Sequence, residues 1–96
     1  GRMKKTETKA KFELGTVCMT PGVTEAVNAK ERAEALYRHS TGDWGDVPFP
    51  DHQENELSLR EGYRLFSVYR TEDGVKFWVI TEADRSVTTL LRPDEY

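Results

Sequence analysis

Little in this sequence can bind a metal, close a disulfide or cross a bilayer. The chain of 96 residues has one cysteine and two histidines, and no apolar run of membrane-spanning length. One cysteine excludes an internal disulfide, and we expect Cys18 to be buried because it lies within an apolar run. His39 and His52 have no companion ligands at metal spacing, so we expect no metal and no cofactor. Without a hydrophobic signal region, the chain is expected to be cytoplasmic.

Charge is divided unevenly along the chain. The whole sequence has 14 basic and 17 acidic residues, and residues 1–11 contain five of the bases but one of the acids. Residues 12–96 therefore have nine bases and 16 acids, a net charge of −7. This charge repels a phosphate backbone, because affinity for nucleic acid depends on Lys and Arg displacing counterions. The composition disfavours a surface for duplex nucleic acid and is compatible with a basic protein partner.

The chain begins with a polar stretch that has no periodicity. We interpret residues 1–11 as a flexible lead-in, whose first residues resemble a cloning remnant, and residues 12–96 as a single domain. Residues 11–19 contain alternating and then β-branched apolar side chains, which predict a first strand with a bulge at Gly15.

Capping signals predict that a helical segment follows and is interrupted once. Thr20 is a good N-cap and Pro21 suits the first helical position, where no N–H is needed. Asn28 with Glu31 three residues later resembles a second capping box, so the helix should break and restart there. The segment should end near residues 39–40.

The next stretch, residues 40–52 (STGDWGDVPFPDH), predicts a loop rich in glycine and proline. Trp44 and Phe49 are too large to be left in water, so we expect the loop to fold back and fill one end of the core. Asp43 and Asp46 flank Trp44, and either bond nearby backbone amides or contact a ligand or partner.

A third helix and a meander of strands complete the chain. Asp51 should cap the helix in a box with Glu54, Gly62 should end it, and Leu57 should be its main apolar anchor. Alternating apolar residues then predict three strands, over residues 63–70, 75–81 and 86–91.

These elements define an α+β fold. We predict an N-terminal strand, two or three short helices and a three-stranded antiparallel meander, which together form a four-stranded sheet. Neither face of the strands is purely polar. We therefore expect the helices to cover one face, and the Trp44 loop, Tyr96 or a second subunit to close the other, which would make the chain a homodimer through that face.

Three stretches resemble a known family: HSTGDWGD, REGYRLFSVYR with its DG turn, and FWVITEADRSVTTLLRPDEY. They are similar to small bacterial proteins of plasmids and other mobile elements, commonly labelled plasmid-related protein or type I restriction endonuclease subunit M. This sequence is shorter between Val27 and Arg32, and has Arg92 where an apolar residue is usual. The restriction label implies a methyltransferase, whose cofactor-binding sheet and Gly-rich loop are missing from these 96 residues. The resemblance thus implies a genomic setting and no mechanism.

Residues from the end of the second helical segment and from the strands could form a catalytic site. His39 can titrate near neutrality and lies beside a Gly-rich loop. Arg85 could hold a phosphate and Thr88 could donate a hydrogen bond to it, while Tyr69 lies two strands away from Thr88, on a neighbouring position. This layout is similar to that of small metal-independent ribonucleases, including the toxin nucleases of mobile elements. Alternatively, His39 is stabilised by the helix dipole, and Glu82, Asp84 and Arg85 pair across their own turn, with Asp84 capping backbone amides.

Two functional hypotheses follow. The first is an accessory protein-binding module that uses Trp44 as an aromatic anchor, with the acidic residues Asp43, Asp46, Glu82 and Asp84 as binding residues and further carboxylates on the third helix. The second is a ribonuclease that uses His39 and Arg85, with Tyr69 and Thr88. A contact between Arg85 and residues 39–46 is the observation that would give the polar turn a functional role.

Overall fold

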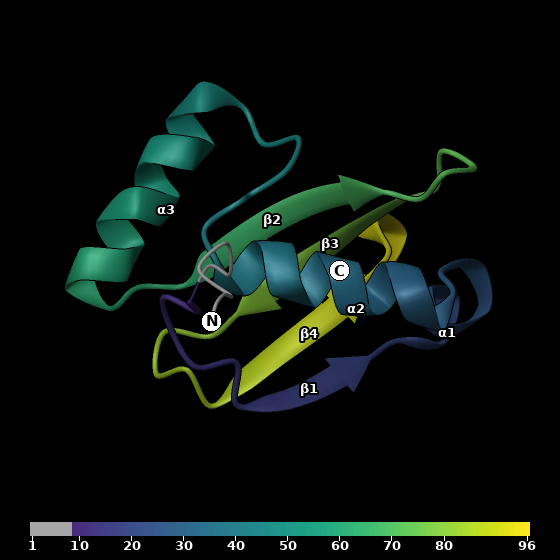
Figure 1. The fold of residues 1–96 in the computed structure, drawn as a ribbon, viewed down its shortest axis with the longest axis horizontal. Coiled ribbons are helices and arrows are strands. Elements are labelled where there is room, and N and C mark those ends of the chain that lie inside the picture. Colours follow the sequence, from purple (N-terminus) through teal and green to yellow (C-terminus); the bar gives the residue numbers. More distant parts are fainter. Residues whose placement is uncertain (1–8) are drawn as a thin grey trace, which may run out of the picture.

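The computed structural model describes residues 9–96, so most of the expected lead-in, with its expected cloning remnant, lies outside the described residues. The elements are, in order, β1 (Thr16–Met19), α1 (Pro21–Ala26), α2 (Ala29–Ser40), α3 (Phe49–Glu61), β2 (Leu65–Arg70), β3 (Lys76–Thr81), β4 (Val87–Leu91) and a 3₁₀ turn, η2 (Pro93–Glu95). Figure 1 shows α2 in front of the sheet and α3 beside one edge of it. The predicted α+β class is confirmed.

The four strands form one sheet in the order β1-β4-β3-β2. The last three strands are an antiparallel meander, as predicted, and β1 joins it parallel to β4, so the sheet is mixed. The predicted start of the first strand at residue 11 is wrong. Gly15 has a φ of +67°, and a Cβ there would lie 2.3 Å from the carbonyl oxygen of Ser86, so the chain turns sharply before β1 begins.

Residues 11–14, expected to be part of that strand, instead cross the end of the sheet. The amide of Lys11 donates to the carbonyl oxygen of Ser40 at 2.7 Å. The carbonyl oxygen of Leu14 accepts from Oγ1 of Thr88 at 2.7 Å. This segment therefore joins the end of α2 to β4.

The predicted helix break is present. The Thr20 side chain accepts from the amide of Val23, and Asn28 Oδ1 accepts from the amide of Glu31 at 2.8 Å, so each helix has its own N-cap. No helix in residues 9–96 combines the length and apolarity needed to span a membrane.

The predicted start of the third helix is wrong. It begins at Phe49, with Pro48 as N-cap, and Asp51 lies within its first turn and does not cap it. Proline is compatible with these first positions because their amides have no intrahelical acceptor. Gly62, with a φ of +81°, ends the helix as expected.

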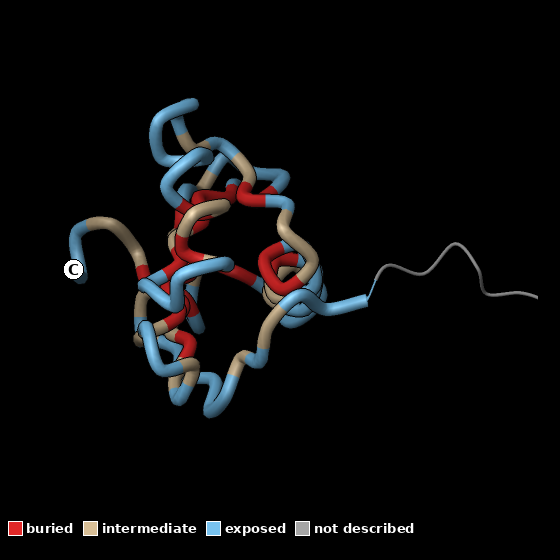
Figure 2. The backbone as a smooth tube through the Cα atoms, turned by 90° about the vertical axis from the view of Figure 1, so that its left-hand side faces the viewer, coloured by how far each residue is buried: buried red, intermediate tan, exposed pale blue. Residues whose placement is uncertain are grey.

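The core lies between the sheet and the first two helices. Val23, Val27 and Ala35 pack against buried side chains of the strands, among them Val79 and Leu90. Figure 2 shows the sheet nearly edge-on, with α2 on one side and the C-terminal tail on the other. On that other face the rings of Trp78 and Tyr96 meet at 5.6 Å, so Tyr96 partly covers it, as expected.

The two edges of the sheet are treated differently. At the β2 edge, the Asn55 side chain accepts from the amide of Phe66 at 3.0 Å and donates to its carbonyl oxygen at 2.7 Å. Further along, the amide of Val68 donates to Trp44 O, and Val68 O accepts from the amide of Asp46. The β2 edge is thus covered. Asn55 and Ser58 are the buried residues of α3, whereas Leu57, its expected anchor, is only half-buried.

All four residues of β1 are exposed. Cys18, expected to be buried, is an exposed free thiol. The local apolar run did not reveal that β1 is the outer strand of the sheet and has no neighbour beyond it in the described chain. Its side chains therefore have a partner strand on one side only.

Candidate functional site at the end of α2

Glycines in the HSTGDWGD segment allow the chain to turn back onto the sheet after α2. The amide of Gly42 donates to the carbonyl oxygen of His39 at 3.2 Å, and its φ of +87° is in the region that favours glycine. Gly45 has a φ of +76°, and a Cβ there would lie 2.0 Å from Val68 O. Only a residue without a side chain allows this close approach, which lets the loop pair with β2.

His39 lies at the centre of a buried hydrogen-bond chain. Its side chain is fully buried. Nδ1 lies 2.6 Å from Oγ of Ser67, and Nε2 lies 2.9 Å from Oγ1 of Thr81. The Thr81 hydroxyl lies 2.7 Å from that of Thr88, which donates to the carbonyl oxygen of Leu14. These bonds connect α2, three strands in the order β2, β3 and β4, and the segment before β1.

The direction of this chain follows from its last member. The Leu14 carbonyl can only accept, so the Thr88 proton points to it and Thr88 must accept from Thr81. Thr81 in turn accepts from Nε2–H of His39. In the neutral ring Nδ1 is then the unprotonated nitrogen and accepts from Ser67. All four side chains are satisfied when His39 is neutral.

The surroundings of His39 disfavour its charged form. Its ring meets Phe12 edge-on at 5.2 Å and Trp44 at 5.7 Å. Burial, with a smaller contribution from the positive charge of Arg85, lowers the pKa of His39 from 6.5 to about 3. A general base near neutral pH requires a pKa closer to 7 and contact with the substrate, so this geometry suits a structural role.

Arg85 holds the polar turn through backbone carbonyls. It donates from Nη1 to Tyr63 O (2.7 Å), Ala83 O (3.1 Å) and Glu82 O (3.2 Å), and from Nη2 to Ser58 O (3.0 Å). Its guanidinium carbon lies 5.6 Å from the centre of the Phe12 ring, which also contacts His39. The structure thus brings Arg85 and His39 together through Phe12, with the guanidinium donors directed at the protein itself.

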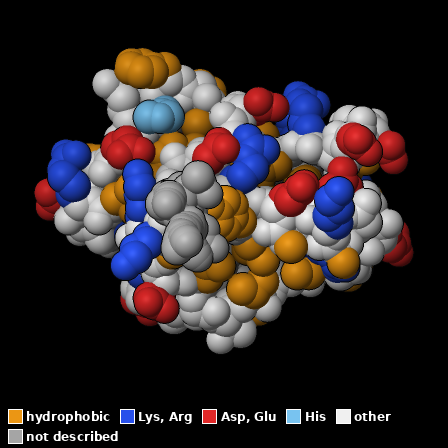
Figure 3. Space-filling view, viewed as in Figure 1, with side chains coloured by type: hydrophobic (Ala, Val, Ile, Leu, Met, Phe, Trp, Pro, Cys, Tyr) orange, Lys and Arg blue, Asp and Glu red, His pale blue; other side chains and the backbone are white. Residues whose placement is uncertain are grey.

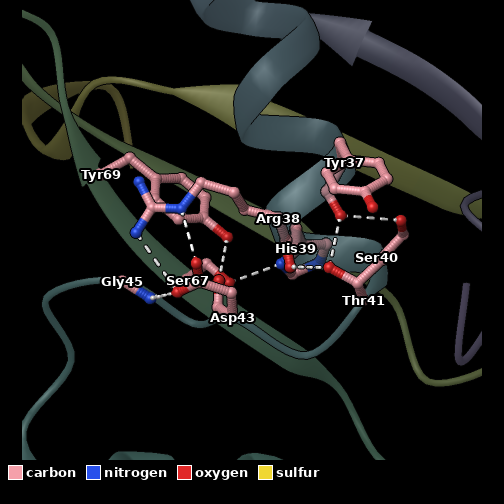
Figure 4. Close-up of polar contacts among 9 residues, drawn as sticks. All are labelled: Tyr37, Arg38, His39, Ser40, Thr41, Asp43, Gly45, Ser67 and Tyr69. Carbon is pink, nitrogen blue, oxygen red and sulfur yellow. Dashed lines mark hydrogen bonds and ion pairs between the residues drawn. The ribbon is translucent and has the colours of Figure 1, made fainter. Parts of the chain in front are cut away.

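Tyr69 and Asp43 form a second cluster, shown in Figure 4. The Tyr69 hydroxyl donates to the Asp43 carbonyl oxygen at 2.6 Å, and burial raises the pKa of this phenol. Arg38 donates to both carboxylate oxygens of Asp43, at 2.8 and 3.2 Å, and lies over the Tyr69 ring. The hydrogen bond from Arg38 lowers the pKa of Asp43. This cluster fixes the loop against β2.

The two aromatic residues of the loop have opposite environments. Trp44 is 2% exposed, and its Nε1 donates to Glu56 at 2.9 Å, so its ring fills the core and is not presented to a partner. Phe49 is 69% exposed and stacks on His52 at 6.4 Å. The expectation that both rings fill the core holds for Trp44 alone. The exposed aromatic side chain of this region is Phe49.

Most of the other expected binding residues have internal partners. Asp46 pairs with Arg70, and Glu82 with Arg64, each at 3.3 Å. Asp84 accepts from the amide and hydroxyl of Ser86, which lowers the pKa of Asp84. The turn is therefore held by backbone contacts of Arg85 and Asp84 and not by a pair between its own charges.

Ser67, Thr81, Phe12 and Asn55 are the residues of this region that sequence reasoning missed. The first two carry a weak signal, since both are hydroxyl residues within otherwise apolar strands, on the face that packs against α2. Their shared partner, His39, is 28 residues away from Ser67 and 42 residues away from Thr81 in the sequence. No local pattern identifies it.

A shallow pocket of about 220 Å³ opens beside this region, between α2 and the β2–β3 hairpin. Its lining combines the carboxylates of Glu31 and Glu34 with the cations of Arg38 and Arg70. Within residues 9–96, no three His, Cys, Asp or Glu side chains are grouped so as to hold a metal ion. No family model, curated protein or solved structure matches the chain.

Proposed function

We propose that this chain is a small accessory protein that acts by binding a basic protein partner. The carrying observation is Phe49, an aromatic side chain that is 69% exposed at the start of a helix with acidic outward residues. Large aromatic side chains in the centre of an interface supply much of its binding energy. Asp51, Glu54 and Glu61 are exposed carboxylates of the same helix, about 120–160° around its axis from Phe49, so a partner has to wrap around α3 to contact both. We call these four residues the α3 surface.

The α3 surface replaces the binding residues expected from the sequence. Trp44 is buried, and Asp43, Asp46 and Glu82 each pair with an arginine. Among residues 9–96, the ion pairs do not involve the three carboxylates of the α3 surface, which are available to a cation from outside. In Figure 3, an apolar side chain and a histidine lie beside carboxylates at the start of α3, at the upper left.

We prefer this function to the ribonuclease, because a nuclease would need His39 and Arg85 to reach a phosphate. His39 is enclosed by Phe12 and Trp44, and both Nη atoms of Arg85 donate to backbone carbonyls of the protein itself. A cytoplasmic location and a mobile-element setting, which rest on the sequence and its resemblance, are part of the proposal. The proposed partner is then a basic bacterial protein associated with a mobile element.

The test is capture of a partner by purified, tagged full chain, with quantitative comparison of variants. Phe49→Ser should lower capture at least about thirtyfold, as expected for a residue worth about 2 kcal/mol. Glu54→Lys should also weaken it, and added salt should weaken it further. Tyr63→Ser is the control, since Tyr63 is 51% exposed beyond the other end of α3. Equal capture by wild type and Phe49→Ser would contradict the proposal.

A further inference from the structure

β1 has an open edge whose backbone groups point away from the protein. The amide of Thr16 donates to Ser86 O at 2.9 Å, and that of Thr20 to Leu90 O at 3.1 Å. Backbone groups of successive residues in a strand point to opposite sides, so Thr16, Cys18 and Thr20 face β4. The N–H and C=O groups of Val17 and Met19 therefore lie along the outer edge of the sheet.

This edge has few of the features that usually prevent strand pairing. β1 has the sequence TVCM, with no charge and no proline of its own, and is protected by its shortness and by Arg32, which donates from Nη1 to Sδ of Met19 at 3.4 Å. Val17 and Met19 are 38% and 37% exposed, so apolar side chains flank the open backbone groups. The β2 edge, by contrast, is covered by Asn55 and the Trp44–Asp46 backbone. Of the two edges, β1 is the one that can accept another strand.

The sequence of the edge is complementary to itself. Residues 16–20 read Thr-Val-Cys-Met-Thr, which is hydroxyl, apolar, thiol, apolar and hydroxyl in either direction. Two antiparallel copies centred on Cys18 place Val17 opposite Met19 and Thr16 opposite Thr20. β1 has no charged residue, so no like charges meet across this pair. Apolar side chains lie opposite apolar ones on one face, and on the second face hydroxyls lie opposite hydroxyls and the two thiols lie opposite each other.

We propose that two copies of the chain pair through β1, antiparallel, with the twofold axis at Cys18. In this register the backbone N–H and C=O of Val17 form two hydrogen bonds with those of Met19 in the other copy. The symmetric Met19–Val17 pair forms two more, which makes four in all. Centring on Val17 would set Met19 opposite Gly15, which lies outside the strand with a φ of +67°. Centring on Met19 would set Val17 opposite Pro21, which has no N–H. The Cys18 register alone keeps all four bonds.

The dimer has a continuous eight-stranded sheet and leaves the α3 surface exposed, so it does not depend on the proposed partner. Each copy has a net charge of −3, and of −7 over residues 12–96, so salt should strengthen this pairing while it weakens binding of a basic partner. Failure of one proposal is therefore distinguishable from failure of the other.

Sedimentation of the reduced full chain between about 1 µM and 1 mM tests the pairing, and should show a mass that rises from one chain to two. Val17→Pro should raise the dissociation constant at least about tenfold, because it removes an outward N–H that makes no bond within the monomer. Met19→Lys, which puts a charge on the edge, should do the same if the proline variant does not fold. A single-chain mass at every concentration would overturn the proposal.

Oxidation with a copper catalyst tests the register. The two Cys18 residues form a pair without mutual hydrogen bonds, with Cα atoms about 4.5 Å apart, which is within the range of a disulfide. Wild type should be trapped as a dimer. The matched control is Cys18→Ser with Thr89→Cys, which moves the thiol to the register partner of Cys18 on β4. Its thiols would be three strand spacings apart, about 14 Å, and should not be trapped. Equal trapping of both proteins would exclude this register.

Discussion

Nε2 of His39 donates to Oγ1 of Thr81 at 2.9 Å, which ties the end of α2 to the middle of the sheet. The bond joins residues 42 positions apart, and both side chains are fully buried. Because the hydroxyl chain ends at the Leu14 carbonyl, Nε2 of His39 is its donor, and burial keeps the ring neutral so that Nδ1 can accept from Ser67. The histidine is thus a structural connector whose protonation the fold resists.

The free energy of unfolding should decrease as pH is lowered, because His39 takes up a proton more readily in the unfolded chain. Its pKa is about 3 in the folded chain and near 6.5 when unfolded, so the unfolded chain takes up the proton first. The contribution is complete above pH 6.5 and is lost as pH falls towards 3. Between pH 6.5 and pH 5, His39 should lower the free energy of unfolding by roughly 1.5 kcal/mol.

Urea unfolding at several pH values measures this loss. His39→Gln should flatten the dependence in this window, while His52→Gln, which changes an exposed histidine, should keep it. Asp43 and Asp84, whose pKa values are lowered from an ordinary 3.8, change the free energy of unfolding mainly below this window. A wild-type slope that His39→Gln leaves unchanged would show that His39 is not the titrating group.

Replacement of Arg85 should destabilise the fold whatever the function. Arg85→Lys keeps the charge but cannot reach four carbonyls with one ammonium group, so we expect a loss of about 2–3 kcal/mol in urea unfolding. Arg85 also has a φ of +62°. Arg85→Gly should therefore be about 1 kcal/mol more stable than Arg85→Ala, because glycine adopts this conformation without strain. If Arg85→Lys is as stable as wild type, the carbonyl contacts are not important.

Trp44 and Phe49 should differ sharply in their effect on stability. Trp44→Ala removes a buried ring and its bond to Glu56, and should cost about 3–5 kcal/mol. Phe49→Ala should change stability by no more than about 0.5 kcal/mol, since the ring is largely in water. Thermal unfolding of the two variants makes the comparison. Similar losses for both would mean that Phe49 is packed in the folded chain and could not serve as an exposed anchor.

Local signals in the sequence determined most of the secondary structure. Thr20 and Asn28 predicted the helix starts, because a cap bonds an amide three residues away. Gly62 predicted a helix end, and alternation predicted the meander. The start of β1 and the start of α3 were misplaced, since close contact of Gly15 with Ser86 and the tolerance of the first helical turn for proline outweighed the apparent patterns.

Only the tertiary structure decided the environment of each side chain. Trp44 and Phe49 were predicted to lie in one loop, yet Trp44 is buried in the loop and Phe49 is exposed at the start of α3. Cys18 lies in an apolar run but on an outer strand, and Asn55 is a polar residue buried against a strand edge. His39 was recognisable as a titratable residue beside a glycine-rich loop, but its partners come from strands that follow much later in the chain. Burial and hydrogen bonding across such separations depend on how the elements pack, which no stretch of sequence encodes by itself.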